Sequence, residues 1–220
     1  MGRIDPEKMR RALRFYFVMG SVNCQLRPES VLKEAIAGGV TLFQFREKGD
    51  AAKTGRDKLE LGAALRDICR ASGIPFIVND NVDLALELDA DGVHIGQEDE
   101  DARVVRRRIG NRILGVSTHD VTEVRHAIAC GADYVGVGPM YPTATKTDTR
   151  SVRGPRMVEA IRAEHADVPL VAIGGIKADH VGPVMSAGAD GVAVISAVSC
   201  SLDPRAAATG LLRAMESATS

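Results

Sequence analysis

Short apolar segments alternate with longer amphipathic segments along almost the whole chain. The apolar segments have the length and the β-branched content of buried strands, and the others have helical spacing. Strict alternation of strand and helix requires a parallel sheet with helical crossovers. The expected strands are 15–19, 40–45, 75–78, 91–94, 112–116, 133–137, 169–173 and 190–195. The expected helices are 28–37, 54–71, 82–88, 99–108, 121–129, 155–164, 177–186 and 204–216.

A short repeat distinguishes a closed barrel from an open doubly wound sheet. Segments 88–93, 131–135 and 188–192 read LDADGV, GADYV and GADGV, and they begin the fourth, sixth and eighth expected strands. A degenerate copy, AGGVT at 37–41, precedes the second strand. Repetition on even strands indicates rotational symmetry, which a closed barrel has and an open sheet lacks. The sequence therefore predicts an α/β protein, a single (β/α)8 TIM barrel over 1–220 with a short helical extension at 1–14.

Composition narrows the class of partner. The 220 residues include 28 Lys and Arg and 29 Asp and Glu, which gives a net charge of -1. Proteins that bind nucleic acid normally carry a basic surface. Aromatic residues are 4% and Trp is absent, so platforms for stacking bases are few. No apolar run has the length of a membrane span, and the four cysteines are scattered. The composition predicts a cytoplasmic protein that binds small molecules, with neither nucleic acid nor membrane as a partner.

Two cations follow the second expected strand, in the segment Gln44-Phe45-Arg46-Glu47-Lys48. A buried strand has no structural need for Arg46 and Lys48 at its end, and these residue types bind phosphate and diphosphate. The alternative is a solvated strand end with a few surface charges. In a barrel, the carboxyl ends of the strands converge on one mouth, where active sites lie.

Carboxylates follow the third and fourth strands, at Asp80 and Asp99. Neighbouring strands lie about 5 Å apart, so the two side chains suit one hard divalent cation, Mg²⁺, shared with a ligand diphosphate. The alternative is that each aspartate caps the helix that follows it. Glu98 and Asp101 are further candidates for the position assigned to Asp99.

Glycines follow the seventh strand, at Gly174 and Gly175, and Ser196 follows the eighth. Barrels bind phosphate monoesters at these two strand ends, because glycine lets the backbone N–H groups approach the ligand. A plain turn is the alternative for the glycine pair. The connection 139–154 is long and polar, and Lys146 lies among its threonines; it is either a binding loop or a surface excursion.

Three polar residues at strand ends complete the candidates. His94 follows an apolar strand and is expected to be a hydrogen-bonded core histidine, not a catalytic base. His119 is expected to be solvated or to interact with the start of a helix, and neither histidine has the spacing of a catalytic triad. Ser117 is the better candidate for facing the mouth.

These segments together resemble the thiamin-phosphate synthase family. The resemblance is carried by QFREK at 44–48, IVND at 77–80, GVHIGQED at 92–99, GVGPMYPTATKTD at 136–148, IGGI at 173–176 and GADGVAVIS at 188–196. The segment MGSVN at 19–23 is similar to the Bacillus-type branch. The resemblance implies a transferase of thiamine biosynthesis that couples hydroxymethylpyrimidine diphosphate with thiazole phosphate. The products are thiamin phosphate and diphosphate, after a Mg²⁺-assisted dissociative loss of diphosphate.

The resemblance also implies roles for individual residues. The residues expected to bind the pyrimidine diphosphate are Gln44, Phe45, Arg46, Glu47, Lys48, Asn79, Ser117 and Lys146. Those expected to bind the thiazole phosphate are Thr143, Ala144, Thr145, Gly175, Ile195 and Ser196. Asp80 and Asp99 would hold Mg²⁺, and Ser117, Lys146 and Arg46 are the expected catalytic residues.

One departure from the family pattern is Asn81, which stands where many relatives carry a second Asp. Any metal contact from that position would be weaker. Two alternatives share the scaffold: a thiazole tautomerase, which performs no coupling, and a non-catalytic sensor of phosphorylated metabolites. Neither alternative needs the combination of Arg46, Lys48, Asp80 and Asp99 with Lys146.

Overall fold

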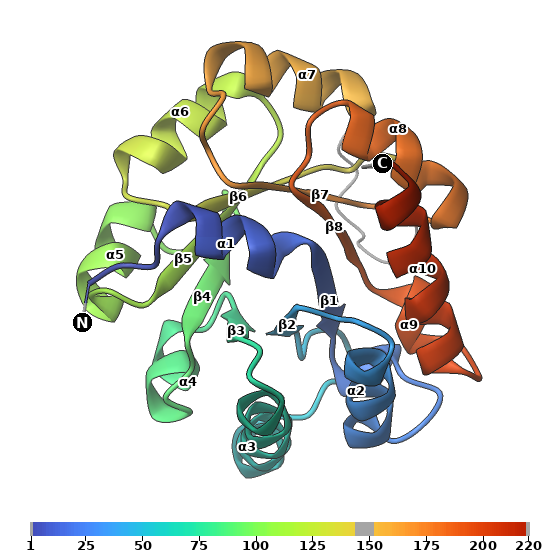
Figure 1. Ribbon diagram of the computed structural model, residues 1–220. Coiled ribbons are helices and arrows are strands. Elements are labelled where there is room, and N and C mark those ends of the chain that lie inside the picture. The colour runs from blue at the N-terminus through green and yellow to red at the C-terminus, as the bar shows by residue number, and fades with distance from the viewer. Residues whose placement is uncertain (1, 144–151, 219–220) are drawn as a thin grey trace.

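Eight parallel strands form a closed barrel in chain order, surrounded by helices (Figure 1). The computed structural model describes residues 2–143 and 152–218. The strands are β1 (Phe15–Met19), β2 (Leu42–Phe45), β3 (Phe76–Asn79), β4 (Gly92–Ile95), β5 (Ile113–Thr118), β6 (Tyr134–Val137), β7 (Leu170–Ile173) and β8 (Gly191–Val194). β8 pairs with β1, which closes the ring. The predicted (β/α)8 barrel is confirmed.

One helix follows each strand along the chain, as the alternation predicted. These helices are α2 (Pro28–Ala37), α3 (Gly55–Ser72), α4 (Val82–Glu87), α5 (Ala102–Ile109), α6 (Val121–Ala129), α7 (Pro155–Glu164), α8 (Ala178–Ser186) and α10 (Pro204–Ala218). α1 (Pro6–Leu13) precedes the barrel. The short helix α9 (Ser196–Ser199) and the 3-10 turn η1 (Ser21–Asn23) are not among the predicted elements. Among the described helices, none combines the length and the apolarity that crossing a membrane would require.

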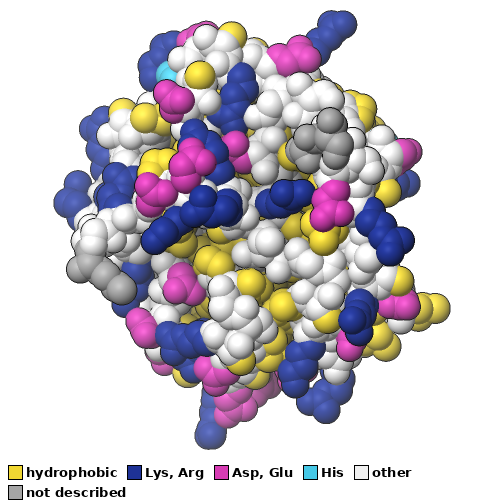
Figure 2. Space-filling view, in the orientation of Figure 1, with side chains coloured by type: hydrophobic (Ala, Val, Ile, Leu, Met, Phe, Trp, Pro, Cys, Tyr) yellow, Lys and Arg dark blue, Asp and Glu magenta, His cyan; other side chains and the backbone are white. Residues whose placement is uncertain are grey.

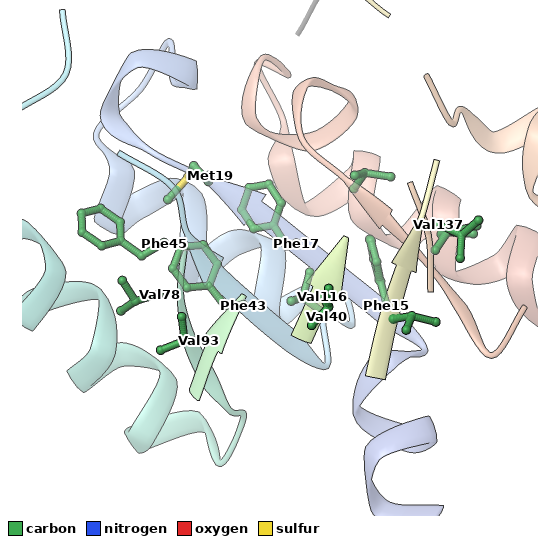
Figure 3. Packing of buried hydrophobic residues seen from close by; sticks show 14 of the residues in the cluster. Phe15, Phe17, Met19, Val40, Phe43, Phe45, Val78, Val93, Val116 and Val137 are labelled. Atoms are coloured by element: carbon green, nitrogen blue, oxygen red, sulfur yellow. The ribbon is translucent and has the colours of Figure 1, made fainter. Parts of the chain in front are cut away.

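Side chains from each strand point alternately into and out of the barrel, because a strand repeats every two residues. Tyr16 and Val18 of β1 belong to the inner cluster of buried residues. Phe15, Phe17 and Met19 belong to the outer cluster, which packs against the helices. Figure 3 shows this outer layer, where aromatic rings from β1 and β2 meet. Burial on both faces explains why the strands are almost uniformly apolar.

The sequence repeat corresponds to a repeated hydrogen-bond arrangement at the start of the strands, which we call the strand-start clamp. Asp133 precedes β6; its N–H donates to the Leu114 carbonyl (2.8 Å), and its carboxylate accepts from the Leu114 N–H (2.8 Å). The same two-way arrangement joins the residue before each even strand to the strand before it. The pairs are Thr41 with Phe15, Asp91 with Phe76, Asp133 with Leu114 and Asp190 with Leu170.

The strand-start clamp also explains an error in the predicted boundaries. The predicted strands 91–94, 133–137 and 190–195 begin one residue too early, at Asp91, Asp133 and Asp190. Each aspartate instead lies just before its strand and uses its carboxylate to bond the neighbouring backbone. A buried or half-buried carboxylate is stable there because it accepts backbone N–H groups.

The helix α1 covers the end of the barrel at which the strands begin (Figure 1). Its buried side chains, Met9 and Leu13, join the inner cluster. Arg3 bonds Asp133 (2.7 Å) and Arg10 lies 3.5 Å from Asp190, so cations of the N-terminal segment reach two clamp aspartates. Figure 2 views this face and shows Lys and Arg side chains interspersed with Asp and Glu side chains across its middle. The opposite end of the barrel is therefore the open one.

Candidate active site

A cavity of about 750 Å³ lies at the carboxyl ends of the strands. Residues that follow β2, β3, β4, β5, β6, β7 and β8 line it, as expected for the mouth of a barrel. Its volume falls within the range of small-molecule sites. β3 and β7 are four strands apart in the ring of eight, so the loops that follow them face each other across the mouth.

On one side of the cavity, two aspartates and two cations lie together. Lys48 Nζ is 2.9 Å from Asp80 Oδ2, and the Gly96 N–H donates to Asp99 Oδ2 at 2.7 Å. Neither aspartate is the cap of the following helix. Asn81 caps α4 by accepting from the Leu84 N–H (2.9 Å), and Asp101 caps α5. The capping alternative therefore does not account for Asp80 or Asp99.

The pKa values of the two carboxyl groups shift in opposite directions. Burial, followed by the hydrogen bond to Asp99, raises the pKa of Asp80 above its ordinary value, although Lys48 opposes this. For Asp99, desolvation acts to raise the pKa, but hydrogen bonds from Asp80 and the Gly96 N–H and the charge of Lys48 outweigh it, so its pKa is lowered. The bond to Asp80 also raises the pKa of Lys48. This is the pattern of two carboxylates that compete for one positive partner.

A hard divalent cation fits this pair. Two carboxylates close enough to share a hydrogen bond repel each other when both are ionised, and a cation between them removes that repulsion. Within the described ranges, no cluster of three acidic, histidine or cysteine ligands forms. Mg²⁺ typically takes one or two carboxylates and completes its shell with water and phosphate oxygens. The donor set therefore suits a metal that binds together with a phosphorylated ligand.

On the other side, the glycine pair after β7 lines the cavity. Gly175 has a φ of +65°, and a Cβ there would lie 2.6 Å from the Pro142 carbonyl oxygen. Glycine is therefore required by both conformation and space. The His180 ring stacks on Tyr141 with 3.7 Å between centroids, and His180 Nδ1 lies 2.9 Å from the Gly175 carbonyl oxygen. These contacts join the β7 loop to the β6 loop.

The floor of the cavity is polar. His94 lines it, is 8% exposed, and places Nε2 2.8 Å from Ser117 Oγ and Nδ1 2.9 Å from Tyr134 Oη. The expectation that His94 is a hydrogen-bonded buried histidine agrees with these contacts. His119 Nδ1 bonds Glu123 near the start of α6 (2.8 Å), which agrees with the expected helix-start contact.

Most of the predicted site residues that the structure describes lie on one cavity. Those that line it are Arg46, Lys48, Asn79, Asp80, Asp99, Ser117, Thr143, Gly175, Ile195 and Ser196. Glu98 and Gly174 also line it. Ala144, Thr145 and Lys146 lie outside the described residues.

Three predicted residues of the QFREK segment lie away from the cavity lining that the structure describes. Gln44 points into the barrel interior and donates from Nε2 to Tyr16 Oη (2.6 Å). Phe45 belongs to the outer cluster and stacks with Phe76. Glu47 turns toward the β1 loop and accepts from Ser21 Oγ at 2.6 Å. Their places follow from strand alternation and from a loop contact, so the family motif includes supporting residues as well as cavity residues.

Three residues at or beneath the cavity are not among the predicted site residues: Tyr16, Tyr134 and Lys177. Lys177 lines the cavity at the start of α8, beside the glycine pair. Tyr16 and Tyr134 lie beneath the cavity, in contact with Gln44 and His94. The sequence could have indicated the two tyrosines, because a phenol at an inward position of an apolar strand needs a buried hydrogen-bond partner.

Comparisons with known proteins identify the family and relatives of this chain. The family model described as thiamine monophosphate synthase matches residues 15–198. The chain belongs to the thiamine monophosphate synthase family. A thiamine-phosphate synthase of Geobacillus thermodenitrificans is 55% identical over 218 residues, which is 99% of each chain. One of Bacillus velezensis is 55% identical over 208 residues, covering 94% of this chain and 93% of the relative. The resemblance to the Bacillus-type branch is confirmed.

A solved structure of the thiamine monophosphate synthase family shows the same fold. The thiamine phosphate pyrophosphorylase from Pyrococcus furiosus superimposes with a TM-score of 0.86 at 35% identity. The match covers 96% of this chain and 100% of that structure. The likeness therefore extends over almost the whole barrel.

Proposed function

We propose that this chain is a transferase of thiamine biosynthesis that joins hydroxymethylpyrimidine diphosphate to thiazole phosphate and releases diphosphate. The family and the relatives at 55% identity support the activity. The observation that carries the proposal is one cavity with two sides suited to anions: the cations and carboxylates after β2–β4, and the glycine loop after β7. A coupling of two phosphorylated substrates needs both sides.

The two sides of the cavity suit the dissociative chemistry that the family resemblance implies. The bond between the pyrimidine methylene carbon and the diphosphate oxygen breaks, and the electron pair leaves with diphosphate. The thiazole nitrogen then forms a bond to the methylene carbon. Such a reaction depends on stabilising the leaving group and aligning the partners more than on a strong base. Arg46 and Lys48 would bind the departing diphosphate, and Gly175 and Ser196 would hold the thiazole phosphate.

Asp80 and Asp99 are the residues that would hold Mg²⁺. The metal would supply positive charge that neutralises the departing diphosphate. Asn79 and Ser117 would contact the pyrimidine, and Thr143 and Ile195 would contact the thiazole phosphate. Lys146, Ala144 and Thr145 belong to the same proposal through the family motif. The cytoplasmic location and the restriction to small-molecule partners, expected from the composition, are also part of it.

The direct test is formation of thiamin phosphate by the purified chain given both substrates, first with Mg²⁺ and then with excess EDTA. Product that disappears with EDTA is expected. Lys146→Ala is expected to lower turnover much more than the free energy of unfolding, and unchanged turnover would exclude its role. Binding of thiazole phosphate without any product would instead indicate a tautomerase or a sensor.

Asp80→Asn tests the carboxylate pair. Asn tolerates the left-handed backbone that Asp80 adopts (φ +61°), so the substitution removes charge without backbone strain. We expect turnover at a fixed Mg²⁺ concentration to fall on the order of a hundredfold. Asp83→Asn is the matched control, because the Asp83 side chain is 86% exposed and pairs with Arg108. Equal turnover in the two variants would remove Asp80 from the proposed metal site.

A further inference from the structure

A continuous chain of polar side chains runs through the barrel interior to the floor of the cavity. We call it the polar chain; its members are Gln44, Tyr16, Tyr134, His94 and Ser117. Successive members are joined by four contacts: Gln44 Nε2 to Tyr16 Oη (2.6 Å), Tyr16 Oη to Tyr134 Oη (2.7 Å), Tyr134 Oη to His94 Nδ1 (2.9 Å), and His94 Nε2 to Ser117 Oγ (2.8 Å). Only its last two members line the cavity.

The fold makes room for the polar chain at two glycines. A Cβ on Gly115 would lie 2.3 Å from the Tyr134 hydroxyl oxygen and 2.5 Å from His94 Nδ1. A Cβ on Gly136 would lie 3.1 Å from His94 Cε1. Glycine inside a strand weakens the strand and marks a close approach by another group. Gly115 and Gly136 therefore weaken their strands but leave the space in which the Tyr134 phenol and the His94 imidazole meet.

Burial requires every member of the polar chain to be satisfied. Tyr16 and Tyr134 are 1% and 0% exposed, and an unpaired buried hydroxyl would cost more than the bond contributes. Burial also raises the pKa of both phenols, so both remain protonated and each has one proton to donate. When each hydroxyl in a row donates one hydrogen bond to a neighbour in that row, all the donations run toward one end of the row or all run toward the other.

The amide of Gln44 selects one of these directions. Since Gln44 Nε2 donates to Tyr16, the Tyr16 hydroxyl is left to donate to Tyr134. Tyr134 then donates to His94 Nδ1, so this ring nitrogen is an acceptor. A neutral imidazole that accepts at Nδ1 carries its proton on Nε2, which donates to Ser117 Oγ. The Ser117 hydroxyl is left with its own proton to donate.

We propose that the polar chain holds His94 in the Nε2–H form and thereby makes Ser117 a hydrogen-bond donor toward the cavity. This inference rests on the proposed function, in which the pyrimidine occupies the site beside Ser117. Ser117 then selects an acceptor atom of the substrate, a pyrimidine ring nitrogen, and disfavours the donor amino group at that position. Gln44, Tyr16, Tyr134 and His94 are positioning residues in this scheme.

Nitrogen NMR of the folded chain with isotope-labelled histidine tests the direction of donation without substrate. The chemical shifts of a neutral imidazole identify which ring nitrogen carries the proton, and His94→Gln assigns the signals among five histidines. We expect the Nε2–H form of His94 in the wild type. The Nδ1–H form would overturn the proposal, and this measurement needs no variant of the polar chain to fold.

Tyr134→Phe removes the donor to Nδ1, and we expect the His94 signals to shift toward a mixture of the two forms. Tyr141→Phe is the matched control: Tyr141 is the third of the three tyrosines and stacks on His180, outside the polar chain. It should leave the His94 signals in place. Unchanged His94 signals in Tyr134→Phe would contradict the positioning role.

A kinetic double-mutant cycle tests the consequence for the substrate. Ser117→Ala and Tyr134→Phe should each raise KM for the pyrimidine diphosphate by roughly tenfold, and the double variant should be no worse than either single one. KM for the thiazole phosphate should stay unchanged. If the KM increases of the two single variants multiply in the double variant, the two residues act independently and the proposal is contradicted. A wild type with the Nε2–H form that makes no thiamin phosphate would overturn the proposed function and leave the direction of donation standing.

Discussion

Two aspartates, Asp80 and Asp89, are the non-glycine residues with positive φ in the described part of the chain (+61° and +48°). Aspartate and asparagine adopt this conformation more readily than other side chains. Asp80 uses it at the cavity, where its carboxyl group meets Asp99 and Lys48. Asp89 uses it before β4, at the other end of the barrel, where it pairs with Arg70 (2.8 Å) and Arg112 (3.0 Å).

Asp89 gives a prediction about acid stability. Hydrogen bonds from Arg112 and Arg70 lower the pKa of Asp89 in the folded chain. A lowered folded-state pKa contributes stability above the unfolded pKa, and that stability is lost as the pH falls through the folded pKa. Asp89→Asn should therefore lower the free energy of unfolding more at pH 7 than at about pH 3, which lies below the ordinary pKa of an unfolded aspartate. Urea unfolding at the two pH values measures this.

A matched control for Asp89→Asn is Asp50→Asn, an exposed position with no ion pair among the described residues. Its difference from the wild type should be the same at both pH values. An Asp89→Asn difference of the same size at both pH values would show that the backbone, not the charge, is responsible.

At the residue scale, a cavity residue could be predicted from the sequence when its position at the end of a strand is enough to place it at the mouth of the barrel. Arg46 and Asp80 follow buried strands, Ser117 is the penultimate residue of β5, and the strand ends of a parallel barrel converge. Glu47 was not predictable, because its direction depends on a contact with Ser21 in another loop. Tyr16 and Tyr134 required knowledge of which inward positions face each other.

At the scale of elements, Glu47 joins the loop after β2 to the loop after β1. Glu47 is 6% exposed, and its carboxylate accepts from the Ser21 N–H (2.7 Å), the Ser21 hydroxyl (2.6 Å) and the Lys53 N–H (2.8 Å). The loops are tightly packed here, since a Cβ on Gly20 would lie 2.1 Å from the Arg46 carbonyl oxygen. The contact holds in place the segment that carries Arg46 and Lys48.

Glu47→Gln should lower the free energy of unfolding by about 1–3 kcal/mol, because the amide nitrogen cannot accept and would face a donor. It should also raise KM for the pyrimidine diphosphate more than KM for the thiazole phosphate. Denaturant unfolding and steady-state kinetics measure the two effects. Glu60→Gln on α3 is the control: its side chain is 60% exposed and pairs with Arg56, so we expect a change within about 0.5 kcal/mol. Equal losses in both variants would contradict the role of Glu47.

The order and type of the elements were predictable from the alternation, whereas their first residues were not. The predicted helix at 99–108 began before α5, because Asp101 and not Asp99 caps that helix. Glu and Asp alternate over positions 98–101, so the sequence offers more than one candidate for the helix cap. The strand-start clamp caused the corresponding error at β4, β6 and β8.

At the scale of the whole molecule, α1 and the barrel share one inner cluster of buried residues. We propose that residues 1–220 form one folding unit that includes α1. Met9→Ala should lower the free energy of unfolding by about 2–5 kcal/mol, since Met9 is 0% exposed at the end of the barrel. A single transition should be retained, as monitored by two spectroscopic probes during urea unfolding.

Lys8→Ala is the control for Met9→Ala, because Lys8 is exposed on the same helix. Its effect should lie within about 0.5 kcal/mol. A Met9→Ala variant with wild-type stability, or a separate early transition, would show that α1 folds apart from the barrel.

Pairing between β1 and β8 has a consequence for synthesis on the ribosome. Phe15 lies in register with Val192. One edge of β1 therefore stays without backbone hydrogen bonds until β8, the last strand, has been synthesised. Until then, the growing sheet has two open edges, at β1 and at the newest strand, and open edges favour association with other chains. The nascent chain is therefore most in need of protection late in its synthesis, after seven strands have emerged and before Gly191–Val194 completes the ring.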